Sequence, residues 1–222
     1  MTAAYADMEQ TRSRLELATL LADLFSDTPP EELAAVAHLC LGQLGPAYDS
    51  REVGLSDKSV LRTLALASGI PLEELQESYA AAGDIGLVAE EALAAKSQQS
   101  LFEAPLTVGR VWERLHALSH ETGTGSQERK FRALAELLHD GTPQDARYIC
   151  RTAVGKLRLG FSQMLLVDGL AEAFGSREER GMVEAAYNRH PDIGWLAQRA
   201  AADFDSLDAV RVEPGIPLRP ML

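Results

Sequence analysis

The chain has 222 residues, of which 46% are hydrophobic and 24% are charged. This is ordinary globular usage, and the length is enough to bury a core as one large domain or two small ones without forced oligomerisation. The apolar runs are shorter than the roughly 18 residues that cross a bilayer, and residues 1–5 lack the flank of a signal peptide. Cys40 and Cys150 have no metal or redox spacing. We therefore expect a soluble, cytoplasmic chain with two buried thiols and no membrane partner.

The formal net charge of −12 argues against nucleic acid as a partner if it is taken as a single number. The charge is unevenly distributed, however. Residues 1–104 hold 6 Lys/Arg against 17 Asp/Glu, residues 105–160 hold 9 against 6, and residues 161–222 hold 6 against 10. The locally positive middle third is either a patch that attracts an anionic partner or ordinary scatter.

Apolar residues recur at helical spacing along much of the chain, and proline, glycine and capping residues mark where helices begin and end. No segment has convincing strand alternation. The pattern predicts an all-α bundle of about ten or more short helices over residues 1–205, followed by an extended, Pro-rich linker over residues 206–222. Helices are expected at about 15–25, 31–45, from Ser56-Asp57, from Pro71, near Asp84, after Pro105-Leu106-Thr107 to 118, 127–139, 142–154, 162–174 and 180–188.

The residues offer few catalytic candidates. His116 and His120 lie four apart on one helical face, which is the spacing of a metal pair, and Glu113 is nearby, but no third ligand follows in a known pattern. A small helical hydrolase or metal enzyme is therefore one alternative function. The other is an acidic scaffold for protein interactions, which the negative net charge favours.

Two glycine-rich turns lie beside cations. Gly123-Thr124-Gly125-Ser126 lacks the Gly-Lys-Ser/Thr ending of a nucleotide-binding loop, so we do not expect it to bind ATP. It could present a helix N-terminus to one phosphate, with Arg129 and Lys130 a turn later, or it could be a plain loop capped by Ser126.

The second turn is Gly155-Lys156-Leu157-Arg158-Leu159-Gly160. Alternation should direct the two cations outward while the two leucines anchor the turn, and Arg147 and Arg151 lie one helical turn apart on the preceding helix. Two such turns could hold duplex backbone without reading sequence.

The chain resembles the N-terminal domain of ATP-dependent DNA ligases of the archaeal and eukaryotic type over nearly its whole length. Suggestive segments are Leu21-Ala22-Asp23-Leu24-Phe25, Thr28-Pro29-Pro30-Glu31-Glu32 and Gly83-Asp84-Ile85-Gly86-Leu87-Val88-Ala89-Glu90. More specific are Gly125-Ser126-Gln127-Glu128-Arg129-Lys130, Tyr148-Ile149-Cys150-Arg151 with the turn that follows, and Pro214-Gly215-Ile216-Pro217-Leu218-Arg219-Pro220-Met221-Leu222.

The resemblance implies an all-helical domain that grips nicked duplex DNA through the minor groove with little sequence preference, in DNA replication, repair and recombination. It implies main DNA contacts at Gly155, Lys156, Leu157, Arg158, Leu159, Gly160, Ser162 and Gln163. Secondary contacts are expected at Gly125, Ser126, Arg129, Lys130 and Arg151, with Arg14 as a looser candidate. Nucleoid association would follow.

The same resemblance implies that the parent ligase uses ATP and Mg²⁺ in a following adenylation domain, whose Lys-x-Asp-Gly motif supplies the lysine that takes AMP, together with an oligonucleotide-binding domain. The present sequence contains no Lys-x-Asp-Gly. We therefore expect this chain to have no catalytic residue, no metal site and no cofactor of its own, and to be inactive alone. Its expected partners are nicked double-stranded DNA and the other ligase domains, with a sliding clamp as a further candidate.

Overall fold

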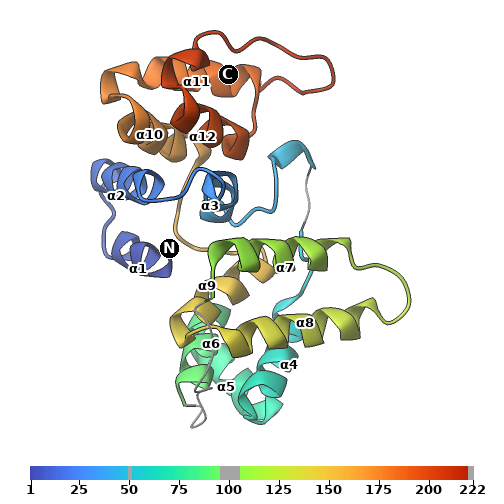
Figure 1. Cartoon of the computed structure of the whole chain (residues 1–222). Helices are drawn as coiled ribbons and strands as arrows, with labels where there is room; N and C mark the ends of the chain where they lie inside the picture. The colour runs from blue at the N-terminus through green and yellow to red at the C-terminus, as the bar shows by residue number, and fades with distance from the viewer. Residues whose placement is uncertain (50–51, 96–105, 220–222) are drawn as a thin grey trace. The chain divides into compact units, whose positions relative to one another are not determined.

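The computed structural model describes residues 1–49, 52–95 and 106–219, and over these ranges the regular secondary structure consists of helices, without strands (Figure 1). Twelve α-helices and three short 3-10 helices are present in this part of the chain. The predicted all-α class is confirmed. Pro105, which contributed to the predicted start of one helix, and the closing Pro220-Met221-Leu222 lie outside the described residues.

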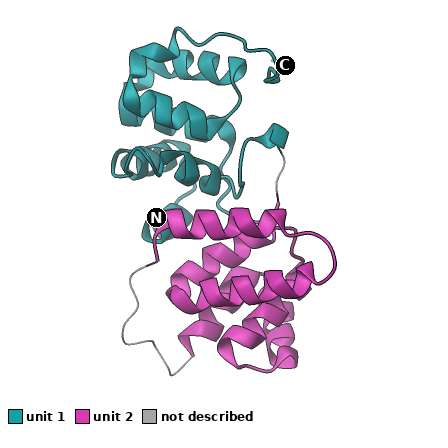
Figure 2. Cartoon of the chain, turned by 45° about the vertical axis from the view of Figure 1, so that its right-hand side comes forward, with its two compact units in different colours: residues 1–51, 158–222 teal, residues 52–157 magenta. Residues whose placement is uncertain are grey.

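The chain forms two compact units (Figure 2). Unit 2 is the continuous segment Glu52–Leu157, and it is inserted between the two segments of unit 1, Met1–Arg51 and Arg158–Leu222. Unit 1 contains α1 (Thr2–Glu9), α2 (Arg14–Ser26), α3 (Leu33–Cys40), η1 (Ala47–Asp49), α10 (Gln163–Phe174), η2 (Arg177–Glu179), α11 (Arg180–Arg189), α12 (Ile193–Ala202) and η3 (Phe204–Leu207). Unit 2 contains α4 (Asp57–Ser68), α5 (Leu72–Ala82), α6 (Ile85–Ala94), α7 (Val108–His120), α8 (Ser126–Asp140) and α9 (Pro143–Ala153).

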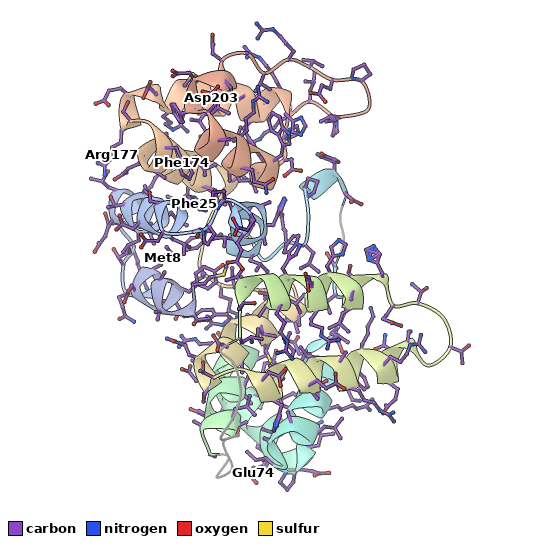
Figure 3. All side chains as sticks on the ribbon, in the orientation of Figure 1. Met8, Phe25, Glu74, Phe174, Arg177 and Asp203 are labelled. Carbon is purple, nitrogen blue, oxygen red and sulfur yellow. The ribbon has the colours of Figure 1, made fainter. Side chains whose placement is uncertain are left out.

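The core of unit 1 is built where α2 packs on α10 and α3 packs on α12. Gly169 of α10 allows the first contact, because a Cβ there would lie only 2.9 Å from the Cβ of Leu21. Figure 3 shows Met8 and Phe25 within unit 1, and both side chains are fully buried. Burial of each side chain of this size stabilises the folded state by roughly 1.5–3 kcal/mol.

In unit 2, α6 packs on α9 and α4 packs on α8. The buried side chains include Leu64, Leu115, Leu134 and Leu138, whereas Glu74 lies at the outer edge of the unit (Figure 3). The helix starts follow the capping rules that the sequence predicted. Side-chain oxygens of Ser56, Asp84, Thr107 and Thr142 each accept a backbone N–H from the first turn of the helix that follows. Thr142 and Asp145 complete a reciprocal capping box.

Helices occur at all ten predicted places, and α1 and α12 were not predicted. α3 is shorter than predicted: it begins at Leu33 and ends at Cys40. The two cysteines are buried, as expected, and burial raises the pKa of the Cys40 thiol to about 12. In the segment predicted as linker, Leu207 and Val210 are buried within unit 1, so the packed structure continues past the predicted boundary at 205.

Among the described residues, no helix combines the length and the apolar character that crossing a membrane requires.

Candidate nucleic-acid interface

α9 ends in a Schellman motif centred on Gly155. The Gly155 N–H donates to the Thr152 carbonyl (N to O, 3.0 Å), and the Lys156 N–H donates to the Arg151 carbonyl (2.8 Å). Gly155 has a φ of 69°, a left-handed conformation that costs glycine nothing and other residues about 1–2 kcal/mol. The glycine therefore ends the helix and fixes the position of the Lys156 backbone.

Lys156 is exposed, as predicted, whereas the neighbouring Leu157 is buried in unit 2. The Lys156 ammonium lies 3.0 Å from Oδ2 of Asp57, the first residue of α4. More than half of the lysine side chain remains exposed in this pair. Lys156 can therefore meet a phosphate, while Leu157, predicted as a DNA contact, contributes its side chain to the core instead.

The second half of the turn belongs to unit 1. Arg158 is exposed and has a φ of 62°, the only non-glycine residue with a positive φ among those described. Leu159 is half-buried, and Gly160 is again left-handed, with a φ of 69°. Exposed Ser162 caps α10 by accepting the Leu165 N–H, and half-buried Gln163 is the first residue of that helix.

At the other glycine turn, α8 begins at Ser126 and the cap position is held by left-handed Gly125, so Ser126 does not cap the helix. Arg129 folds back over this loop. Its Nη1 donates to the Thr124 carbonyl and its Nη2 to the Thr122 carbonyl, both at 3.2 Å, and its Nε donates to Glu121 at 2.7 Å. Arg129 therefore braces the loop while about half of its side chain stays exposed.

Lys130 requires a correction. We predicted a DNA contact, which needs an accessible ammonium, but the residue is only 7% exposed. Its Nζ donates to the Val53 carbonyl at 2.7 Å. A buried ammonium needs such a partner, so the side chain is committed inside unit 2. We therefore assign Lys130 to anchoring the segment that leads into α4.

A lysine in or next to each of the two glycine turns contacts the segment at the start of α4. Lys130, one helical turn into α8, holds Val53, and Lys156 holds Asp57 four residues later. Four residues of chain span at most about 14 Å. The structure therefore brings two segments that are well separated in sequence to one short stretch of unit 2.

Arg151 also requires a correction. It is 4% exposed, and its Nε and Nη2 donate to the two carboxylate oxygens of Asp84 at 3.1 and 2.8 Å. Burial alone would raise the pKa of Asp84, but hydrogen bonds from Arg151 and from the Gly86 and Leu87 N–H groups hold it below its ordinary value. Arg151 is therefore a buried clamp between α9 and α6, and we do not assign it to DNA.

Gly86 and Glu90 complete this clamp. A Cβ at Gly86 would lie 2.7 Å from the Arg147 carbonyl oxygen, so only glycine allows α6 to approach α9 so closely. Glu90 accepts a hydrogen bond from Arg147 at 3.1 Å. From the sequence, Asp84 was predicted only as a helix start, and no partner was predicted for Glu90.

Arg14 is exposed on the first turn of α2 in unit 1. Its Nε and Nη2 both donate to Oδ2 of Asp168, at 2.9 and 2.8 Å, and Arg180 donates to the other oxygen of the same carboxylate at 2.6 Å. These residues border a groove of about 490 Å³, and Arg177 on its rim lies at the edge of unit 1 (Figure 3). Carboxylates already neutralise much of the positive charge in this groove.

The alternative of a metal enzyme gains no support. The rings of His116 and His120 are tilted by 43° with centroids 4.7 Å apart, and Trp112 stacks on His116. Among the residues that the structure describes, no group of three or more His, Cys, Asp or Glu side chains could hold a metal ion.

Comparison with known proteins adds what geometry alone does not give. The family described as "DNA ligase N terminus" matches residues 1–171, a stretch that includes every residue predicted to contact DNA. The chain belongs to the DNA ligase N-terminus family.

Full-length relatives are similar to this member of the family. They include "DNA ligase 2" of Korarchaeum cryptofilum, 43% identical over 98% of this chain and 37% of the relative. "DNA ligase 2" of Thermofilum pendens is 42% identical over 98% and 38%, and "DNA ligase" of Pyrobaculum arsenaticum is 40% identical over 99% and 38%. The chain thus spans between a third and two fifths of the length of these relatives.

Proposed function

We propose that this chain holds nicked duplex DNA through its phosphate backbone, in the minor groove and without sequence preference, so that the catalytic domains of a DNA ligase can seal the nick. The observation that carries the proposal is the turn after α9. It presents the exposed side chains of Lys156 and Arg158 from a backbone fixed by two left-handed glycines. The clamp of Arg151 on Asp84 ties α9 to α6 just before the turn and supports it.

Such a surface suits a backbone contact better than a base contact. Phosphate contacts position a protein on DNA but carry no sequence information, and the minor groove presents a degenerate pattern of donors and acceptors. Ser162 and Gln163 at the start of α10, a few residues further along the chain than Arg158, offer a hydroxyl and an amide. Local positive charge within an acidic chain would also steer the DNA to this turn.

We further propose that the parent protein is an ATP-dependent ligase of replication, repair and recombination, with the adenylation and oligonucleotide-binding domains and a sliding clamp among its partners. ATP and Mg²⁺ would act in the adenylation domain. The residues of this chain do not fit ATP, because none of its lysines lies in a Lys-x-Asp-Gly motif and the loop at 123–126 lacks a nucleotide-binding lysine. Incubation with labelled ATP and Mg²⁺ should leave the chain unlabelled after denaturing electrophoresis.

Salt-dependent DNA binding tests the proposal. Fluorescence anisotropy with nicked duplexes of several sequences should give similar affinities. If Lys156, Arg158 and two or three other cations each neutralise a phosphate, the log–log salt slope should be about −4, at roughly −0.9 per contact. A slope near zero would reject DNA as the partner. Salt-insensitive association with a protein would favour an interaction scaffold instead.

Charge reversal at the turn locates the site. Lys156→Glu with Arg158→Glu should remove measurable binding while circular dichroism shows an intact helical fold, because both side chains are exposed. The matched control is Arg114→Glu with Arg211→Glu, which also reverses one exposed cation in each unit. Equal losses in the two variants would contradict the assignment of the turn as the site. Arg177 and Arg180 are poor controls, because they pair with Glu172 and Asp168.

A further inference from the structure

α4 presents two exposed cations close to the proposed interface. Lys58 and Arg62 lie four residues apart, so they share one face of the helix, with a rise of about 6 Å between them. Within the described part of the chain, neither forms an ion pair or a hydrogen bond through its side chain. The next residue on this face is Leu66, which is 63% exposed and uncharged, so the cationic surface covers the first two turns of α4.

The position of this surface is tied to the turn after α9. Lys58 directly follows Asp57, whose carboxylate pairs with the Lys156 ammonium. The segment leading into α4 is held from the other side by Lys130, whose buried ammonium binds the Val53 carbonyl. These two contacts place the start of α4 next to the turn and to α8. Lys58, Arg62 and Lys156 therefore lie in one part of unit 2.

We infer that Lys58 and Arg62 form a second phosphate-binding surface, which extends the contact of Lys156 along the backbone of the same duplex. This inference rests on the proposed function. Consecutive phosphates of one strand rise by about 3.4 Å along the duplex axis, so two cations roughly 6 Å apart can meet neighbouring phosphates. Among the residues that the structure describes, no carboxylate forms an ion pair with either cation, in contrast to Arg14, Arg177 and Arg180 around the groove of unit 1.

The net charge of residues 1–104 gives no indication of this surface. Residues 1–104 carry 17 acidic side chains against 6 basic ones, and Lys58 and Arg62 are two of the six. In the folded chain, Lys58 and Arg62 are not surrounded only by the acidic residues 1–104, because α4 packs on α8 within unit 2. DNA is favoured over an acidic peptide as the occupant because Lys58 directly follows Asp57, which pairs with Lys156 of the turn proposed to bind DNA.

Neutralising the two cations tests the inference. Lys58→Gln with Arg62→Gln should reduce the log–log salt slope by about 1.8, at roughly 0.9 per phosphate contact, and weaken binding by more than tenfold at about 0.1 M salt. The control is Arg114→Gln with Arg211→Gln, which also removes two exposed cations that form no side-chain ion pair among the described residues. The control should leave the slope nearly unchanged. Thermal unfolding should confirm that both variants fold.

The possible results separate this inference from the proposed function. If the unaltered chain binds DNA with a slope of about −4 and the Lys58/Arg62 variant keeps that slope, the second surface is wrong and the proposed function stands. Equal losses in variant and control would show a general charge effect and would also overturn the local contact. If the unaltered chain does not bind DNA, the proposed function fails, and the inference fails with it.

Discussion

The Lys156 ammonium lies 3.0 Å from the Asp57 carboxylate, so the cation proposed to hold a DNA phosphate already has an anionic partner within the protein. The pair is partly exposed, with 53% of the lysine side chain and 29% of the aspartate side chain accessible. Exposed pairs of this kind contribute only about 0–1 kcal/mol. Under the proposed function, a phosphate would displace Asp57, and the carboxylate would lower the affinity for DNA.

Asp57→Asn should tighten DNA binding. Removing a charge about 4 Å from the phosphate site is worth roughly 1 kcal/mol in water, which corresponds to about a fivefold lower Kd. The helix start should lose about 0.3–1 kcal/mol of stability, because an acid in the first turn of α4 is removed. Anisotropy and thermal unfolding measure the two effects. Asp140→Asn, which breaks the surface pair with Arg110, is the control. Weaker binding by Asp57→Asn would mean that the carboxylate orients Lys156 rather than competing for it.

Arg151→Met should destabilise unit 2 by about 3–5 kcal/mol, because it leaves the buried Asp84 carboxylate without its charged partner. Urea unfolding measures the loss. The double variant with Asp84→Asn should recover part of it, since neither buried charge then remains unpaired. Arg132→Met, which breaks an exposed pair with Glu128, should cost less than about 0.5 kcal/mol. A similar small cost for Arg151→Met would contradict the role of a buried clamp.

The Asp84 clamp also predicts a pH dependence. The folded-state pKa of Asp84 lies below the ordinary value of 3.8, so its contribution to stability is complete above that value and is lost as the pH falls toward the folded-state pKa. The difference in unfolding free energy between the unaltered chain and Asp84→Asn should therefore be constant from about pH 7 to 5 and should shrink below about pH 4. Urea titrations across this range provide the measurement, and a difference independent of pH would refute the linkage.

Arg158→Gly should separate stability from binding. Relief of roughly 1–2 kcal/mol of left-handed strain is partly offset by the greater unfolded-state entropy of glycine, so the free energy of unfolding should rise by up to about 1 kcal/mol. The DNA salt slope should fall by about 0.9 because one phosphate contact is lost. Arg158→Lys should keep both the strain and the binding. A less stable glycine variant would show that side-chain interactions of Arg158 outweigh its strain.

The helices were largely predictable because their starts are encoded locally. Ser56, Thr107 and Thr142 lie next to the segments that they cap, and Pro29-Pro30 and Gly155 mark boundaries within a few residues. α1 was missed for a physical reason, because it has eight residues and no side-chain cap. α12 does carry a local start signal, since Asp192 accepts the Gly194 and Trp195 N–H groups, so its omission has no such reason.

The candidate site was predictable only in part, because exposure is not encoded locally. Alternation correctly placed Lys156 and Arg158 outside and Leu157 inside. Nothing near Lys130 or Arg151 in sequence reveals that Val53 and Asp84, 77 and 67 residues away, take up their charges. For the same reason, the pairing of Lys156 with Asp57, 99 residues away, had no sequence signal.

The insertion of unit 2 within unit 1 determines the order in which the chain can fold during synthesis. Unit 2 is continuous and is complete once residue 157 has left the ribosome. α2 must wait for its main packing partner α10, and Arg14 and Asp168, which join the two helices, are 154 residues apart. Domains generally fold as units as they emerge, and distant contacts form late. The N-terminal helices are therefore made first but buried last, and unit 2 is able to fold while they remain incomplete.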